Sequence, residues 1–235
     1  MALVDTHTHQ WREVADLGKW ELAHPATDVT SDVEVSGVPY SMIAFGDSLL
    51  VVEANHGQLI RIAPRSGAID LFTDIQALEG HIVPTSLAER YGQLYLGNLG
   101  LFPVTQASAQ VQVLAYGGFL PLAPGFSDGD PNYHVVDQKS GFTTVVAVDF
   151  GPDGLLYALE IADLSGFPVP PNSDPTGAGK VVRVTRAGVI EDVVTGLTMP
   201  TGMTFGPDGD LYIANYGDVP GGQGQILKML LPRDQ

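Results

Sequence analysis

Short apolar runs alternate along the chain with clusters of glycine, proline, aspartate and asparagine. The clearest unit spans residues 199–215, where one apolar run leads through Gly-Pro-Asp-Gly into a second apolar run. Similar units span residues 144–160, 83–98 and 38–53. Because Pro fixes φ and Gly tolerates positive φ, such clusters favour tight turns between paired strands. Each unit therefore predicts two antiparallel strands.

Further apolar runs follow each of these units. Third strands are predicted at 58–62, 111–114, 181–184 and 225–229, and fourth strands at 68–72 and 189–194. Four antiparallel strands repeated every 45 to 60 residues are typical of a β-propeller blade. We therefore predict an all-β chain, a β-propeller of four-stranded antiparallel blades in one domain, 1–235. The four blade repeats cover about 37–75, 83–140, 143–197 and 199–231.

The last repeat stops after its third strand. Residues 3–17 align with 59–75 as a third strand, a turn and a fourth strand. We therefore expect residues 10–16 to complete the last blade and to close the ring, because closure removes exposed strand edges.

Composition narrows the functional classes. The chain has 235 residues, with 11 Lys plus Arg and 27 Asp plus Glu, so its net charge is 11 − 27 = −16. Nucleic acid is excluded as a partner, because its binding depends on cationic neutralisation of phosphates. No run of about 18 apolar residues predicts a membrane span. No signal peptide is visible, and the absence of cysteine excludes disulfides and thiolate sites. A soluble protein is expected, and its compartment stays open.

The repeats resemble those of NHL-repeat and gluconolactonase-like propellers, and more closely those of the ScyD/ScyE family. The resemblance covers about residues 10 to 231. Its most specific segments are Val83-Pro84-Thr85-Ser86, Gly100-Leu101-Phe102-Pro103, the run 151–161, Gly166-Phe167-Pro168-Val169-Pro170-Pro171, and Thr198-Met199-Pro200-Thr201-Gly202. Because such propellers have six blades, the resemblance implies that the first two blades are absent from this chain.

A polar residue ends the second predicted strand of each repeat. These residues are Glu53, Asn98, Glu160 and Asn215. In a closed propeller they would lie around one mouth of the central channel, together with Tyr40, Thr85 and Thr201 at the entry to the first strands. One interpretation is a binding ring whose carboxylates Glu53 and Glu160 hold Ca²⁺ or Mg²⁺. The other is that each residue caps the following turn by accepting backbone N–H bonds.

The catalytic sites of the related propellers do not transfer directly. In gluconolactonase-like propellers the metal is held partly by Asn and Asp after the proline that opens the first strand. Here those positions hold Tyr40, Thr85, Val146 and Thr201. Lyases of the streptogramin type use a His and a Glu beside Mg²⁺, and His56 near Glu53 is the nearest candidate pair.

Two further motifs suggest metal binding. Asp5-Thr6-His7-Thr8-His9 has the Asp-x-His-x-His spacing of metal-dependent amidohydrolase barrels, but the β-repeats favour a hairpin turn here instead. Asp128, Asp130 and Asn132 begin like a calcium loop, yet Tyr133 replaces the usual glycine and Lys139 the bidentate glutamate. The calcium-loop motif lies in an insertion, 115–141, which we expect to be a long loop.

The sequence thus predicts a binding scaffold for a small molecule or a protein, which uses the loop face and the channel mouth. One alternative is a divalent-metal-dependent hydrolase or lyase of the gluconolactonase or streptogramin-lyase type. Another is an oligomer-forming propeller fragment, in which two chains self-associate to cover mismatched edges. Residues 1–37 and 111–180 carry −5 and −6 of the net charge, which favours a cation or cationic ligand.

Overall fold

A computed structural model describes most of the chain. The described residues are 1–4, 7–25, 37–101, 104, 108–116, 133–162, 176–217 and 222–231. They divide into two compact units, Met1–Pro84 with Ala115–His134, and Thr85–Leu114 with Val135–Gln235. Among these residues, no helix is long and apolar enough to span a bilayer.

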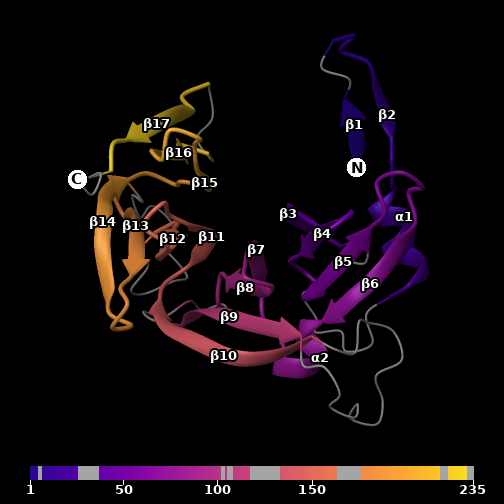
Figure 1. Cartoon of the computed structure of the whole chain (residues 1–235), viewed down its shortest axis with the longest axis horizontal. Coiled ribbons are helices and arrows are strands. Elements are labelled where there is room, and N and C mark those ends of the chain that lie inside the picture. Colours follow the sequence, from indigo (N-terminus) through magenta and orange to yellow (C-terminus); the bar gives the residue numbers. More distant parts are fainter. Residues whose placement is uncertain are drawn as a thin grey trace. The chain divides into compact units, whose positions relative to one another are not determined.

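Each repeat forms one antiparallel sheet, as predicted for propeller blades (Figure 1). The first sheet contains β3 (Pro39–Phe45), β4 (Ser48–Glu53), β5 (Gln58–Ile62) and β6 (Ile69–Asp74). The second contains β7 (Pro84–Arg90), β8 (Gln93–Asn98), β9 (Ala109–Tyr116) and β10 (Tyr133–Phe142). The third contains β11 (Val145–Phe150), β12 (Leu156–Glu160), β13 (Gly179–Val184) and β14 (Ile190–Leu197). The fourth contains β15 (Gly202–Phe205), β16 (Leu211–Asn215) and β17 (Gln225–Met229).

The Gly-Pro-Asp-Gly clusters form the predicted turns between first and second strands. Gly154 and Gly209, the last residues of the two clusters, both have a φ of +77°. Their N–H groups donate to the carbonyl oxygens of Gly151 and Gly206, in both cases at 2.9 Å. Glycine is favoured there because L side chains rarely adopt this conformation.

The N-terminal segment forms a hairpin like the outer half of a blade. Strands β1 (Ala2–Val4) and β2 (Trp11–Glu13) pair in antiparallel register and lead into helix α1 (Leu17–Ala23). Strands β5 and β6 likewise lead into helix α2 (Ile75–Glu79). The predicted hairpin is confirmed.

The predicted pairing of residues 10–16 with the last blade stays a prediction, because the two segments belong to different units. Strand β2 pairs with β1, and the fourth sheet has three strands within the described ranges.

The expectation that 115–141 is one long loop is wrong at its C-terminal end. Residues 133–142 form β10, which pairs with β9 as the fourth strand of the second sheet (Figure 1). At its start, Tyr133 packs on Phe72 with the ring centroids 4.9 Å apart. Its middle residues are polar and exposed, so the strand lacks the apolar run by which the others were predicted.

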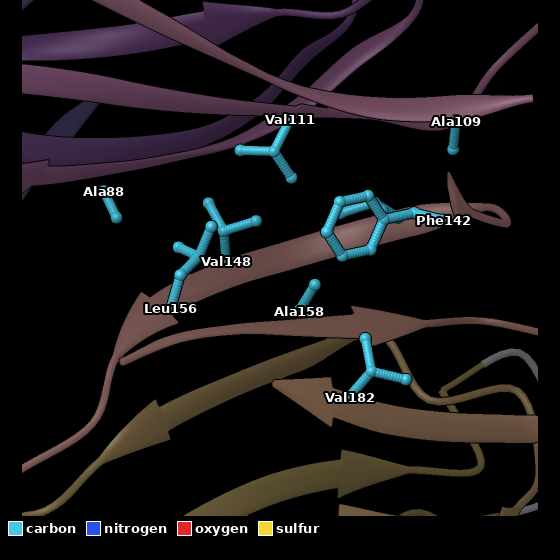
Figure 2. Close-up of a cluster of buried hydrophobic side chains, with 9 residues drawn as sticks. Ala88, Ala109, Val111, Phe142, Val148, Leu156, Ala158 and Val182 are labelled. Atoms are coloured by element: carbon cyan, nitrogen blue, oxygen red, sulfur yellow. The ribbon is translucent and has the colours of Figure 1, made fainter. Parts of the chain in front are cut away.

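The core of the second unit lies between neighbouring sheets. One cluster joins the second and third sheets through Ala88, Val111, Phe142, Val148 and Ala158, among others (Figure 2). Another joins the third and fourth sheets, where the ring of Tyr157 meets that of Phe205 edge-on, 5.0 Å between centroids. The sheets therefore present buried apolar faces to each other, as the blades of a propeller do.

The core of the first unit lies between α1 and the first sheet. Ala15 and Leu17 pack against Val51, Ile60 and Ile62. The buried residues of α1 are Leu17 and Glu21, which lie one helical turn apart on the same face. An acidic side chain is therefore carried into this apolar contact.

Candidate functional site

Glu53 ends β4 and is completely buried, with an exposure of 0%. Its Oε1 accepts hydrogen bonds from the backbone N–H groups of Val38, at 2.5 Å, and Asn55, at 3.0 Å. Its Oε2 accepts one from the backbone N–H of His56. The Nδ1 atom of His56 lies 3.9 Å from the same Oε2. One side chain thus holds together the entry to β3 and the turn after β4.

The equivalent residues of the other three sheets also accept backbone N–H groups. Glu160 accepts the Thr143 N–H at 3.0 Å, and Asn215 accepts the Thr198 N–H at 2.8 Å. Asn98 accepts the N–H of Gln110, at the start of the third strand, at 3.1 Å. All three are buried, with exposures of 1–6%. Only Glu53 accepts N–H groups from the turn that follows its own strand, whereas Glu160 and Asn215 accept an N–H that precedes the first strand of their sheets.

A lysine lies beside Glu160 and would compete with a metal ion for its carboxylate. The Nζ atom of Lys180 lies 3.6 Å from Oε2 of Glu160 and 3.3 Å from Oδ1 of Asp192. The positive charge that a buried carboxylate requires is therefore supplied by the protein itself. Glu53 belongs to the first unit and Glu160 to the second, and a ring shared by the four second-strand residues stays a prediction.

Three more predicted ring residues differ in exposure. Thr85 is buried, and its hydroxyl group points to the carbonyl oxygens of Gly97, at 3.2 Å, and Val145, at 2.7 Å. It therefore ties the second sheet to the third. Tyr40 is 43% exposed on β3, while Thr201 is half-buried against Gly217. Of these three residues, Tyr40 is the most accessible to a ligand.

Glu21 was not identified from the sequence. It lies on α1, is 0% exposed, and neither of its carboxyl oxygens has a hydrogen-bond partner among the described residues. Burial, and in second place the charge of Glu53, raise the pKa of Glu21 to about 7. No repeat pattern marks this residue, because its burial depends on how α1 packs.

A polar network on the third and fourth sheets was also not predicted from the sequence. The Tyr157 hydroxyl donates to Asp153 at 2.9 Å, and the Tyr212 hydroxyl donates to Asp208 at 2.8 Å. Arg183 lies 3.8 Å from Asp153, and the Lys228 ammonium group donates to Asp208 at 2.8 Å. Hydrogen bonds from Lys228 and Tyr212 hold the pKa of Asp208 well below its usual range. The Asp-x-x-x-Tyr spacing, which occurs in both repeats, is the sequence pattern from which this network could have been predicted.

The two remaining metal motifs gain no support. His7 and His9 lie in the hairpin between β1 and β2, as predicted. Asp128, Asp130 and Asn132 lie outside the described residues. Within the described ranges, no group of three or more His, Cys, Asp or Glu side chains is arranged to hold a metal ion. Of the other histidines, His24 is the C-cap residue of α1, and His134 belongs to β10.

Comparison with known proteins supports the blade architecture. No protein-family model matches the sequence, and no curated protein matches it. The PQQ-bound aldose sugar dehydrogenase from Streptomyces coelicolor is similar in structure, with a TM-score of 0.55 and 16% identity over 77% of this chain and 57% of that one.

Two further solved structures have lower TM-scores. A gluconolactonase from Xanthomonas campestris gives 0.47, with 15% identity over 77% of this chain and 53% of that one. A chain of a nidogen/laminin complex gives 0.49, with 11% identity over 81% of this chain and 62% of that one. This chain thus spans 53–62% of the length of these three proteins. At 16% identity, the similarity to the dehydrogenase concerns the fold alone.

Proposed function

We propose that the chain is a propeller-type binding scaffold, which takes a small molecule or a protein at the edge where the second strands end. The observation that supports this most is a buried polar side chain at the end of each second strand, which accepts a backbone N–H group and is called a clamp below. The four clamps, at the ends of β4, β8, β12 and β16, are Glu53, Asn98, Glu160 and Asn215. Each clamp ties the end of a second strand, from which the segment to the third strand starts, to a nearby backbone N–H group. A rigid base under a variable segment is a common design for binding surfaces.

Two of the segments that follow these clamps in the sequence have a composition suited to binding. Residues 99–108 and 161–178 each contain the tripeptide Phe-Pro-Val, at Phe102-Pro103-Val104 and Phe167-Pro168-Val169. Aromatic side chains give large contact areas at low entropic cost, and proline limits the conformations that binding must select. Combined with the net charge of −16, this composition favours a neutral or cationic ligand with an apolar part.

A ligand screen tests this proposal. Neutral and cationic small molecules are screened by thermal shift, and each hit is measured by calorimetry on the wild type. We expect Phe102→Ala and Phe167→Ala to weaken binding about tenfold or more. Tyr91→Ala is the matched control, because Tyr91 is 89% exposed at the turn between first and second strands. Hits that respond to Tyr91→Ala alone, or a screen without hits, contradict the proposal.

A second candidate is a divalent-metal-dependent hydrolase or lyase, which one contact favours. The His56 ring lies 3.9 Å from Glu53, which resembles the His and Glu that streptogramin-type lyases use. Hydrolysis of glucono-lactones and streptogramin cleavage, assayed with Mg²⁺ or with EDTA, test it. Activity that disappears with His56→Gln supports this candidate, and inactivity on both substrates removes it.

A third candidate is self-association through the fourth sheet. Strand β17 has no fourth strand beside it in the described chain, and Ile226 on it and Leu230 directly after it are 73% and 70% exposed. Light scattering of the wild type and of Ile226→Lys tests this candidate. A concentration-dependent dimer that Ile226→Lys dissociates supports it, whereas a monomer at high concentration contradicts it.

Membership of the ScyD/ScyE family is likewise part of the proposal, and the segments that resemble this family support it.

A further inference from the structure

Glu21 and Glu53 lie against the same peptide unit in the first unit of the chain. A Cβ atom added to Gly37 would be 2.1 Å from Oε2 of Glu21, so this carboxyl group fills the space beside residue 37. The N–H of the next residue, Val38, donates to Oε1 of Glu53. Helix α1 and the end of β4 thus bring two fully buried carboxyl groups close together.

The two carboxyl groups differ in what satisfies them. Three backbone N–H groups donate to Glu53. In the described part of the chain, no group donates to Glu21, and no lysine or arginine forms an ion pair with either glutamate. A buried carboxylate without a donor or a counter-ion is costly, and a second carboxylate nearby increases the cost. The arrangement therefore requires a positive charge to be stable in its ionised form.

The chemistry of the site limits what can supply this charge. Both glutamates are completely buried, so the ligand is a small one. Carboxylate oxygens are hard ligands that suit Ca²⁺ and Mg²⁺. Ca²⁺ accepts bidentate carboxylates in flexible geometry, whereas Mg²⁺ requires a near-octahedral shell and retains several waters. A confined site with one uncommitted carboxyl group therefore favours Ca²⁺.

We propose that Glu21 and Glu53 bind one Ca²⁺ ion between α1 and the first sheet. Glu21 supplies a bidentate carboxylate, Glu53 supplies the second negative charge, and backbone carbonyl groups or waters complete the coordination. Because no group of three acidic or histidine side chains in the described chain is arranged to hold a metal ion, we expect modest affinity, with a Kd on the order of 10⁻⁴ M. The ion would link α1 to the base of β3, and this role does not depend on binding at the loop edge.

Terbium luminescence gives a direct test, because Trp20 precedes Glu21 and can sensitise a bound Tb³⁺ ion. We expect the wild type to show sensitised Tb³⁺ emission that Ca²⁺ displaces, and a melting temperature that Ca²⁺ raises above an ionic-strength-matched NaCl control. Glu21→Gln should abolish both effects. This variant should still fold, because it removes a buried charge.

Glu79→Gln is the matched control, since Glu79 occupies the corresponding position of α2 and is exposed. Its Ca²⁺ response should equal that of the wild type. The proposal is overturned if Ca²⁺ has no effect on the wild type, if Glu21→Gln responds as the wild type does, or if Glu79→Gln loses the response equally. It is also overturned if a double substitution, Asp128→Asn with Asp130→Asn, removes the response while Glu21→Gln retains it.

Discussion

Single buried polar side chains hold the connections between strands in place. The second-strand residue of each sheet, Glu53, Asn98, Glu160 or Asn215, gives a backbone N–H group an acceptor that water cannot provide. A buried N–H without a partner costs about 1–3 kcal/mol. These side chains therefore contribute to stability first, and any role in binding is built on that contribution.

Asn215→Ala should destabilise the protein by roughly 1–3 kcal/mol, because the Thr198 N–H loses its acceptor. Urea unfolding followed by circular dichroism measures the loss. Gln223→Ala, an exposed amide in the connection after β16, should change stability by less than about 0.5 kcal/mol. Asn215→Asp, which retains an oxygen acceptor, should recover part of the loss. Equal stability of the Ala variant and the wild type would show that the clamp contributes nothing.

Glu21 should make stability depend on pH in metal-free buffer with EDTA. Its pKa is about 7 in the folded chain, against an ordinary value of 4.5, so the folded state binds the proton more tightly. The stabilisation that this tighter proton binding gives the folded state is therefore fully present below pH 4.5. It is lost as the pH rises to about 7. The loss should be roughly 2 kcal/mol at pH 8.

Glu21→Gln provides the comparison for this pH dependence. The variant and the wild type should have similar free energies of unfolding near pH 4.5, and the variant should be more stable at pH 8. Urea unfolding across this range measures the difference. A difference that does not vary with pH would mean that Glu21 does not titrate in this range.

Strands of neighbouring sheets approach closely where glycine leaves room. A Cβ atom at Gly97 on β8 would lie 2.8 Å from both Oγ of Ser86 and Cγ1 of Val145 on β11. Gly97→Ala should therefore destabilise by about 1–3 kcal/mol through overpacking. Gly202→Ala on β15 should be neutral or slightly stabilising, because no atom lies within 4 Å of its added Cβ. Thermal unfolding of the two variants checks the contrast.

The short helices depend on their aspartate caps. Asp74 accepts the Ala77 N–H at 2.9 Å, and Asp16 accepts the Lys19 N–H at 3.1 Å. Asp74→Ala should cost about 1 kcal/mol, or somewhat more because the Gln58 amide also donates to Asp74 at 3.2 Å. Asp74→Asn should retain most of the stability. Chemical unfolding checks both, and equal losses in the two variants would contradict a capping role.

At the scale of elements, strand prediction succeeded where period-two apolar runs meet glycine turns. Strands β5 and β17 lie at the residues predicted for them, 58–62 and 225–229. Strand β10 was not predicted because few of its residues are buried and apolar, and the residues next to it in the sequence are polar. The hydrogen bonds of β9, rather than its own apolar pattern, make it a strand.

The charge of the whole molecule should make it sensitive to salt. A net charge of −16 repels itself in the compact state, and salt screens that repulsion. Raising NaCl from about 0.02 to about 0.3 M should therefore raise the melting temperature by a few degrees. Scanning calorimetry measures the shift. A melting temperature that falls with salt would mean that attractive ion pairs, such as those of Lys228 and Lys180, outweigh the repulsion.

The sequence by itself determined the blades, because turn chemistry and apolar periodicity are local properties that repeat along the chain. It also singled out Glu53, Asn98, Glu160 and Asn215, since their place in the repeat is a matter of counting. The tertiary structure alone decided what these residues do, which depends on which backbone groups lie opposite them. It decided too that Glu21 is buried beside Glu53, because the desolvation of a helix side chain is set by the partner on which the helix packs.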